Sequence, residues 1–188
     1  MVDFLFIGDS LTFGYGVSKK DSFVYKIQEL KCELHILNKG INGDTSTGIL
    51  SRFYKDVTLN KPKNVFIMCG TNDLLSGRNV DSIISNIEIM IKDSLSINSK
   101  VFIGIPPDII KDLAFELFAP SNYYKNTEKF LPILREKLLS LKEKYPITLI
   151  DFYSLTNKNK YNNIYLDGIH LNPKGQNLLF TEACKIIF

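Results

Sequence analysis

Residues 2–10 read VDFLFIGDS, an almost wholly apolar run that stops abruptly in a small polar turn. A strand with one solvated face alternates apolar and polar residues, whereas a strand buried on both faces is nearly continuously apolar. Residues 2–7 therefore predict a central strand of a parallel sheet that is covered by helices on both sides. Ser10 follows at the carboxyl end of that strand, which is where such sheets bind their ligands.

Along the rest of the chain, short apolar runs alternate with longer segments of helical spacing. Further strands are predicted at residues 34–38, 65–69, 101–105 and 147–150, and helices at residues 22–31, 45–57, 81–95, within 121–144 and from 173 to about 187. Five β-α repeats predict one domain over residues 1–188, a three-layer α/β/α fold with a five-stranded parallel sheet. The expected flavodoxin-like strand order, 2-1-3-4-5, places strand one between strands two and three. The longest irregular stretches are expected at residues 106–120 and 152–171, and loops of that length are usually functional.

The composition is that of an ordinary globular protein. Of 188 residues, 45% are hydrophobic and 23% are charged, and the net charge of +3 comes from lysines that are spread along the chain. The densest basic stretch, residues 158–160, is interpreted as a solvated loop, so no nucleic-acid partner is expected. The three cysteines form no CxxC or zinc pattern, which favours a reduced compartment and no metal site.

The chain shows no sign of export or membrane insertion. Met1 leads directly into the first predicted strand, with no basic leader, and no apolar run approaches the ~20 residues of a membrane helix. We therefore expect a cytoplasmic protein without stable membrane insertion. Coiled-coil heptads are absent, so the sequence leaves the oligomeric state open.

A hydroxyl, an imidazole and a carboxylate are predicted to lie beyond the carboxyl ends of the strands. A serine is a poor nucleophile unless a base takes its proton and a third group orients that base. For Ser10, the candidate base is His170, in the loop before the last helix, and Asp167 stands three residues earlier. The second histidine, His35, falls inside the predicted second strand and is interpreted as a packed, structural residue.

Three hydrogen-bond donors are also predicted at this edge of the sheet. They are the backbone N–H of Ser10, the backbone N–H of Gly43 after the second strand, and the side-chain amide of Asn72 after the third. Singly, Gly43 fits a loop glycine before a helix, Asn72 fits an Asx turn, and D-x-x-H is a weak motif. Their coincidence at matching strand ends favours nucleophilic acyl transfer with an oxyanion hole.

Four short blocks resemble those of the SGNH hydrolases, the GDSL-type esterases and lipases. The blocks are GDSL at residues 8–11, NGDT at 42–45, GTND at 70–73 and DGIH at 167–170, and they occur in the family's order. The resemblance implies the SGNH hydrolase fold, with Ser10 as nucleophile, His170 as base, Asp167 as its partner, and Ser10, Gly43 and Asn72 as oxyanion donors. The acidic residues of the blocks, Asp9 and Asp73, are interpreted as loop-shaping hydrogen-bond acceptors. The chain has no G-x-S-x-G, no complete G-x-G-x-x-G and no P-loop.

The expected function is hydrolysis of a small-molecule carboxylic ester through an acyl-enzyme on Ser10, with no cofactor and no metal. Two alternatives use the same site, an acyltransferase and a carbohydrate deacetylase. A more remote alternative is a non-catalytic flavodoxin-like module that binds an anion at a helix N-terminus. Residues 109–124 are unusually apolar and form either a lid or a packed helix. The candidate substrate-binding residues are Phe13, Tyr15, Leu74, Ile109 and Phe118.

Overall fold

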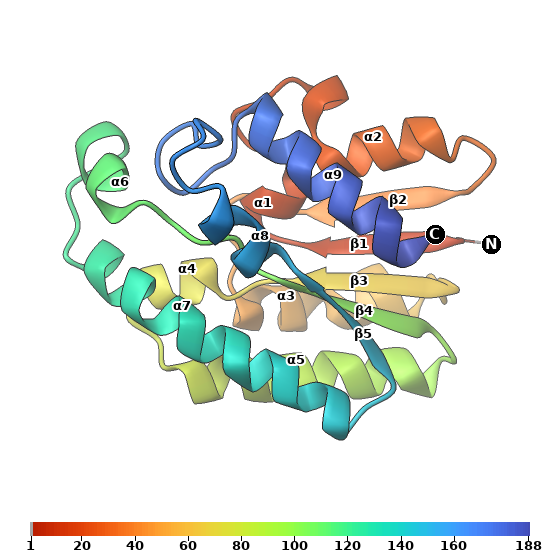
Figure 1. The fold of residues 1–188 in the computed structure, drawn as a ribbon. Helices are drawn as coiled ribbons and strands as arrows, with labels where there is room; N and C mark the ends of the chain where they lie inside the picture. The colour runs from red at the N-terminus through yellow and green to blue at the C-terminus, as the bar shows by residue number, and fades with distance from the viewer. Residues whose placement is uncertain (1) are drawn as a thin grey trace.

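Five parallel strands form one sheet at the centre of the molecule (Figure 1). The structure is a computed structural model that describes residues 2–188. The strands are β1 (Phe4–Gly8), β2 (Ile36–Gly40), β3 (Asn64–Met68), β4 (Lys100–Ile105) and β5 (Ile147–Asp151). They pair in the order β2-β1-β3-β4-β5, and all four pairings are parallel. The predicted α/β fold class and strand order are confirmed.

Helices connect the strands and cover both faces of the sheet. They are α1 (Ser10–Phe13), α2 (Phe23–Leu30), α3 (Ser46–Phe53), α4 (Thr71–Leu75), α5 (Val80–Ser96), α6 (Lys111–Leu117), α7 (Tyr123–Ser140), α8 (Phe152–Lys158) and α9 (Pro173–Ile187). Two 3₁₀ turns, Lys19–Asp21 and Leu141–Glu143, and a π-helical turn, Tyr54–Thr58, complete the described elements. Figure 1 shows α2 and α9 on one side of the sheet and α3, α5 and α7 on the other.

The alternation of side chains along β1 separates two cores. Leu5 and Ile7 pack with the apolar faces of α3, α5 and α7, and Phe4 and Phe6 pack on the other face with α2, α8 and α9. All five residues of β1 are buried, as expected for a strand that is covered on both faces. The nearly continuous apolar sequence of residues 2–7 therefore has its physical reason in the two helical layers.

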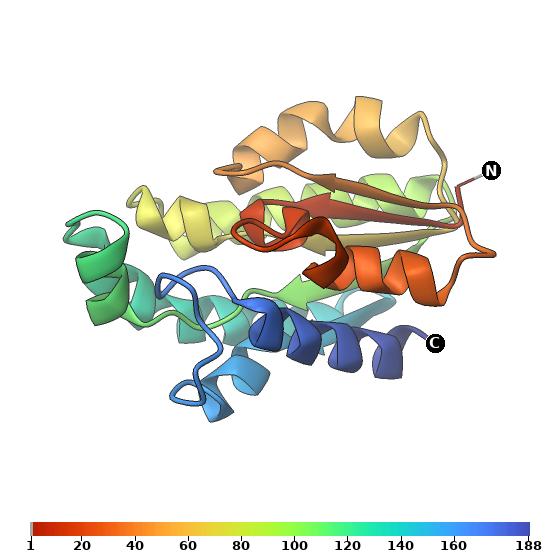
Figure 2. The same ribbon diagram turned by 90° about the horizontal axis from the view of Figure 1, so that it is seen from above.

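The carboxyl ends of the strands gather the short helices and the long loops at one end of the molecule. Gly8, Gly40 and Met68 lie side by side in the sheet register, so β1, β2 and β3 end at the same level. Figures 1 and 2 show α6 and the loop before α9 beyond this edge, with both termini at the opposite end. The segments that follow the three strands are thereby brought into one place.

Several predicted boundaries need correction. The stretches expected to be irregular, 106–120 and 152–171, contain helices α6 and α8. Helix α8 follows β5 without a loop, because the Asp151 carboxylate accepts a hydrogen bond from Ser154 N–H at 2.9 Å and caps its first turn. His35 precedes β2 and is exposed, so its interpretation as a packed histidine is wrong.

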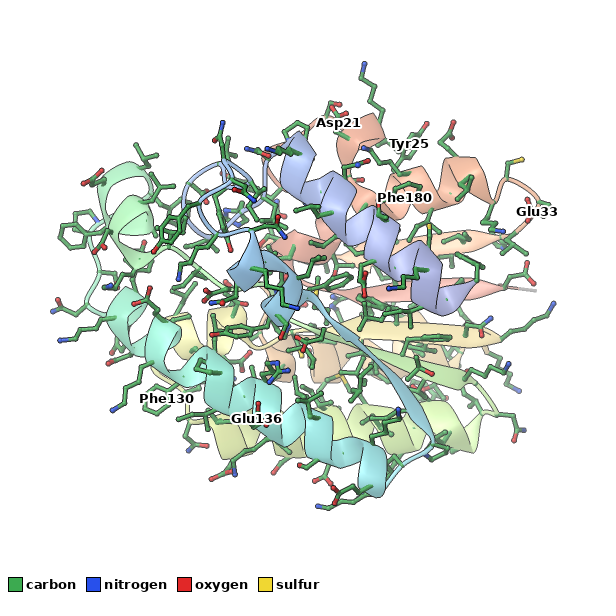
Figure 3. The ribbon with its side chains drawn as sticks, in the orientation of Figure 1. Asp21, Tyr25, Glu33, Phe130, Glu136 and Phe180 are labelled. Carbon is green, nitrogen blue, oxygen red and sulfur yellow. The ribbon has the colours of Figure 1, made fainter. Side chains whose placement is uncertain are left out.

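The outer surfaces of the helical layers carry both charged and apolar side chains; Leu30, Ile89 and Ile133 are among the exposed apolar ones. Glu33, before β2, and Glu136, on α7, are exposed (Figure 3). Tyr25 and Phe180 lie on the outer layer made by α2 and α9, and both are partly buried. Within residues 2–188, none of the helices combines the length and the apolar character needed to cross a lipid bilayer.

Candidate active site

Ser10 lies in the first turn of α1, directly after β1. The Asp9 carboxylate accepts a hydrogen bond from Leu11 N–H at 2.9 Å and so caps this four-residue helix. Gly14 ends it in the left-handed conformation, with φ of 89°. The Ser10 N–H belongs to a helical first turn, where the helix itself offers no acceptor. The sharp transition from strand to helix therefore leaves both the hydroxyl and the backbone N–H of Ser10 without an acceptor or donor from α1 itself, so both are free for other partners.

The structure brings Ser10, His170 and Asp167 into one hydrogen-bonded chain. His170 Nε2 lies 3.0 Å from Ser10 Oγ, and His170 Nδ1 lies 2.7 Å from Asp167 Oδ2. The three side chains belong to residues that are 6%, 7% and 8% exposed, respectively. This is the geometry in which an imidazole can take a proton from a serine while a carboxylate orients the ring.

Asp167 is held in its charged form by its neighbours. Burial alone would raise the pKa of this carboxyl group, but hydrogen bonds from the His170 ring, the His170 N–H and the Ile169 N–H outweigh burial and lower it. The two backbone donors meet Asp167 Oδ1 at 2.7 Å and 3.0 Å. A carboxylate that accepts several N–H groups stays ionised at neutral pH, so Asp167 can orient and stabilise a charged His170.

A tight loop holds this carboxylate and imidazole in place. Gly168 has φ of 85°, and an added Cβ would lie 2.5 Å from Ile110 O and from Ala114 N. The Gly168 carbonyl accepts a hydrogen bond from Ile110 N–H at 2.8 Å, which ties the loop to the start of α6. Glycine is therefore required here both for its backbone conformation and for its close approach to α6.

Gly43 and Asn72 lie at the same cavity as Ser10 and His170. Gly43 is exposed in the loop after β2 and has φ of 77°. Asn72, in the first turn of α4, donates a hydrogen bond from Nδ2 to Asp44 O at 2.9 Å. The second hydrogen of Nδ2 has a longer contact, 3.5 Å to Asp9 Oδ2, so that hydrogen is the one that remains available to a ligand.

The cavity beside Ser10 has a volume of about 140 Å³. Its walls are mainly apolar, and two aromatic rings flank the imidazole. The Tyr15 ring lies 4.4 Å from the His170 ring and the Phe118 ring lies 6.0 Å from it, between centroids. The remaining lining residues are Asn42, Leu75 and Ile169. The cavity is small by the standard of drug-sized pockets, which measure roughly 300–1,000 Å³.

Two of the five expected substrate-binding residues, Tyr15 and Phe118, line this cavity. The other three do not. Leu74 and Ile109 are buried in the core of the α3, α5 and α7 face. Phe13 lines a larger hollow, of about 540 Å³, beside α2 and β2, and this hollow shares no lining residue with the cavity at Ser10.

Leu75 is a candidate from the sequence on the same ground as Leu74, whereas the lining residues Asn42 and Ile169 were missed. Leu75 follows Asn72 by three positions in α4, and residues three apart share a helix face. That spacing was the available signal, although Leu74 fits the sequence pattern equally well. Ile169 stands inside the DGIH block, between Asp167 and His170.

Two buried carboxyl groups support the loops around the site. Burial is the main cause that raises the pKa of Asp9 to about 7; the nearby carboxyl groups of Asp73 and Asp44 act in the same direction, and Leu11 N–H and His170 oppose it. Burial likewise raises the pKa of Asp73, whose carboxylate accepts hydrogen bonds from Ser46 N–H at 2.8 Å and Ser46 Oγ at 2.7 Å. Both residues are hydrogen-bond acceptors as interpreted, but their backbone donors, Leu11 N–H and Ser46 N–H, lie in the first turns of α1 and α3 and not in loops. Across residues 2–188, no cluster of three or more His, Cys, Asp or Glu side chains has the arrangement of a metal site.

Sequence comparison identifies the class of protein. The model of the GDSL-like lipase/acylhydrolase family matches residues 6–178. The chain therefore belongs to this family of hydrolases, and the resemblance to the SGNH hydrolases is confirmed. No curated protein sequence matches the chain.

Solved structures share the fold over nearly the whole chain. A lipase/acylhydrolase from Enterococcus faecalis is 27% identical, with a TM-score of 0.74, and the match covers 100% of this chain and 95% of that one. A member of the lipolytic G-D-S-L family from Veillonella parvula DSM 2008 is 21% identical, with a TM-score of 0.81 and coverage of 99% and 98%. A catalytic mutant of an acetylxylan esterase from Geobacillus stearothermophilus is 19% identical, with a TM-score of 0.80 and coverage of 99% and 94%.

Proposed function

We propose that this protein is a serine ester hydrolase that forms an acyl-enzyme on Ser10. The observation that carries the proposal is the chain of contacts from Ser10 Oγ through His170 to Asp167, at 3.0 Å and 2.7 Å, which opens onto a cavity also lined by Gly43 and Asn72. The proposed nucleophile, base and oxyanion donors all line this small, largely apolar cavity, and the proposed orienting carboxylate lies behind the base.

In the proposed first step, His170 Nε2 accepts the hydroxyl proton as Ser10 Oγ attacks the ester carbonyl. The carbonyl oxygen becomes an oxyanion that accepts hydrogen bonds from Ser10 N–H, Gly43 N–H and Asn72 Nδ2. The bond to the leaving alcohol then breaks, and His170 gives its proton to that alcohol. In the second step, His170 takes a proton from water as the water oxygen attacks the acyl-enzyme carbonyl. The bond from that carbon to Ser10 Oγ then breaks, His170 returns its proton to Ser10 Oγ, and the acid leaves.

The size of the cavity favours a short acyl group. About 140 Å³ between Tyr15, Phe118, Leu75 and Ile169 leaves little room beyond the reacting carbonyl. The acetylxylan esterase named above shares the fold at 19% identity. We therefore include removal of acetyl groups from a carbohydrate or small alcohol within the proposal.

A series of p-nitrophenyl esters from acetyl to dodecanoyl tests this function. Ser10→Ala is compared with Ser140→Ala, because Ser140 is an exposed serine on α7 whose hydroxyl donates only to Lys137 O. We expect hydrolysis to vanish in the first variant and to persist in the second. A fluorophosphonate reagent should also modify Ser10 alone among the serines.

Ester hydrolysis that persists in Ser10→Ala would contradict the proposal. Modification of Ser10 without hydrolysis, together with acyl transfer to an added alcohol or sugar, would identify an acyltransferase instead. Absence of both reactions would leave the anion-binding module as the better description.

A further inference from the structure

We propose that Arg52 is a positioning residue that holds the oxyanion donors of Gly43 and Asn72 in place. The inference rests on the proposed function, because it concerns two of the three donors assigned there. Arg52 lies on α3 and touches neither Ser10 nor the cavity. Its effect therefore has to pass through Asp44.

The Arg52 guanidinium joins three separate parts of the chain. Its Nε donates to Asp44 Oδ2 at 2.8 Å, its Nη1 donates to Asp56 Oδ2 at 2.8 Å, and its Nη2 donates to Gly8 O at 3.2 Å. The three charged side chains are only 12–16% exposed, so solvent screens these bonds weakly. One rigid fork thus links the end of β1, which precedes the nucleophile, with the loop that carries Gly43.

Asp44 passes this constraint on to both donors. Its carboxylate is held by Arg52 and by Thr45 N–H, the latter at 3.0 Å. Its carbonyl accepts one hydrogen of Asn72 Nδ2 at 2.9 Å and so directs the other away from Asp44. Gly43 directly precedes Asp44 in the same exposed loop, so the position of Asp44 also affects the direction of the Gly43 N–H.

The Arg52–Asp44 contact adds to a weak turn at this loop, in which Asp44 N–H donates to Ile41 O at 3.2 Å. An added Cβ at Gly43 would meet no atom within 4 Å, so no neighbouring atom packs against that side of Gly43. Oxyanion donors stabilise a transition state only when they are already oriented before charge develops. We infer that the Arg52–Asp44 contact supplies this orientation from the side of the loop that faces α3.

Four variants separate positioning from simple stability. Arg52→Gln removes the guanidinium. Asp44→Asn keeps the backbone carbonyl that accepts from Asn72 but removes the carboxylate that pairs with Arg52. Asp56→Asn weakens the contact of Arg52 with the π-helical turn that follows α3, and also the Lys39–Asp56 pair at 3.5 Å, but it leaves the Arg52–Asp44 contact. Arg135→Gln is the matched control, since Arg135 donates to Asp151 at 2.8 Å and is likewise partly buried but lies on α7.

The first measurement is the steady-state hydrolysis of p-nitrophenyl acetate. For Arg52→Gln and Asp44→Asn, we expect kcat to fall about 10- to 100-fold, with KM changed less than about threefold, as for donors that act only in the transition state. Arg52→Lys should recover only part of the loss, because one ammonium group cannot reproduce the three contacts of the planar guanidinium. Asp56→Asn and Arg135→Gln should keep kcat within about twofold, whatever they cost in thermal stability.

The second measurement compares a trifluoromethyl ketone with the matching methyl ketone as inhibitors. Ser10 Oγ adds to the trifluoromethyl ketone, the proton passes to His170, and the carbonyl oxygen becomes an anion in the oxyanion hole. Arg52→Gln should weaken this inhibitor by about the same factor as kcat, whereas the methyl ketone should bind within about twofold of the parent protein.

The outcomes distinguish the inference from the function on which it rests. Hydrolysis that depends on Ser10 but is unaffected by Arg52→Gln and Asp44→Asn would overturn the positioning role alone. Equal weakening of both ketones, or an equal loss of kcat in Arg135→Gln, would also overturn it, because either would indicate a general structural effect. If Arg52→Gln fails to fold, Asp44→Asn decides. Absence of any Ser10-dependent reaction would remove the proposed function and the inference together.

Discussion

Asp9 is the buried carboxyl group nearest in sequence to the nucleophile, and its charge bears on folding. Burial raises its pKa to about 7 in the folded chain, from an ordinary value of 3.8. Between these two values the folded protein binds about one more proton than the unfolded protein at this group. The contribution of Asp9 to stability is therefore fully present below pH 3.8 and is lost as the pH rises through about 7.

Asp9→Asn should remove this part of the pH dependence of stability. The amide keeps an acceptor for Leu11 N–H and cannot ionise. Between about pH 3.8 and 7, we expect the unfolding free energy of the parent protein to fall relative to the variant by about 1.4 kcal/mol per pH unit. Urea unfolding at several pH values measures this difference, with the exposed Asp112→Asn as a control that should run parallel to the parent. A parallel curve for Asp9→Asn would show that Asp9 is ionised throughout.

Asn72→Ala removes a single proposed oxyanion donor. We expect kcat for p-nitrophenyl acetate to fall on the order of 100-fold, because one such donor contributes about that much in the transition state. Asn64→Ala is the control, since Asn64 begins β3 at the opposite edge of the sheet, where its amide donates to Asp3 O at 2.8 Å. Turnover of Asn72→Ala that matches Asn64→Ala would refute the assigned donor role.

At this scale the sequence predicted the polar groups of the site better than its walls. Ser10, Gly43, Asn72 and the loop with His170 follow strands, and parallel strands place such positions together whatever the details of packing. Which apolar side chain lines the cavity depends instead on the direction in which a helix face points. Leu74 and Leu75 are adjacent in the sequence, yet only Leu75 reaches the cavity.

The helices that the sequence left unassigned, or gave only as an alternative, are all short. Helices α1, α4, α6 and α8 contain four, five, seven and seven residues, which is at most two turns. Two turns are too few for a period of 3.6 residues to show in the apolar pattern, and such helices are stable only through contacts with the rest of the fold. The long helices α5, α7 and α9 were predictable because each presents a repeated apolar face.

The residue that follows α6 borders the cavity beside Ser10. Phe118 follows α6 and lines the cavity, whereas Phe115 in α6 lies on a different hollow. Phe118→Ala should enlarge the acyl space and raise kcat/KM for octanoyl relative to acetyl esters, by roughly tenfold for the burial of one or two further methylene groups. Phe115→Ala is the matched control and should leave the ratio unchanged. An unchanged ratio in Phe118→Ala would place the acyl group elsewhere.

The two hydrophobic cores share the strands of one sheet, so the packing of one core depends on that of the other. Each central strand sends alternate side chains to the two helical layers, so neither layer can lose its packing without exposing the same strands. This property was readable in the sequence, because strands buried on both faces have nearly continuous apolar runs. We propose on this basis that the chain folds as a single domain.

Cooperative unfolding would test that proposal. Phe53→Ala in α3 and Phe23→Ala in α2 each remove a fully buried ring, one from each core, at an expected loss of about 3–5 kcal/mol. We expect each to shift one common transition, seen equally by far-UV circular dichroism and by tyrosine signals. The exposed Phe115→Ala should shift it little. Two transitions, of which each variant moves only one, would mean that the layers unfold separately.

The contact between Ser10 and His170 joins two residues that are 160 positions apart. During translation, the ribosome must add 160 residues beyond Ser10 before the proposed base, His170, exists. Until then, Ser10 has no partner that could take its proton. On the proposed mechanism, a Ser10-directed probe would therefore react only with chains that extend past residue 170 and have folded, and shorter products would not react.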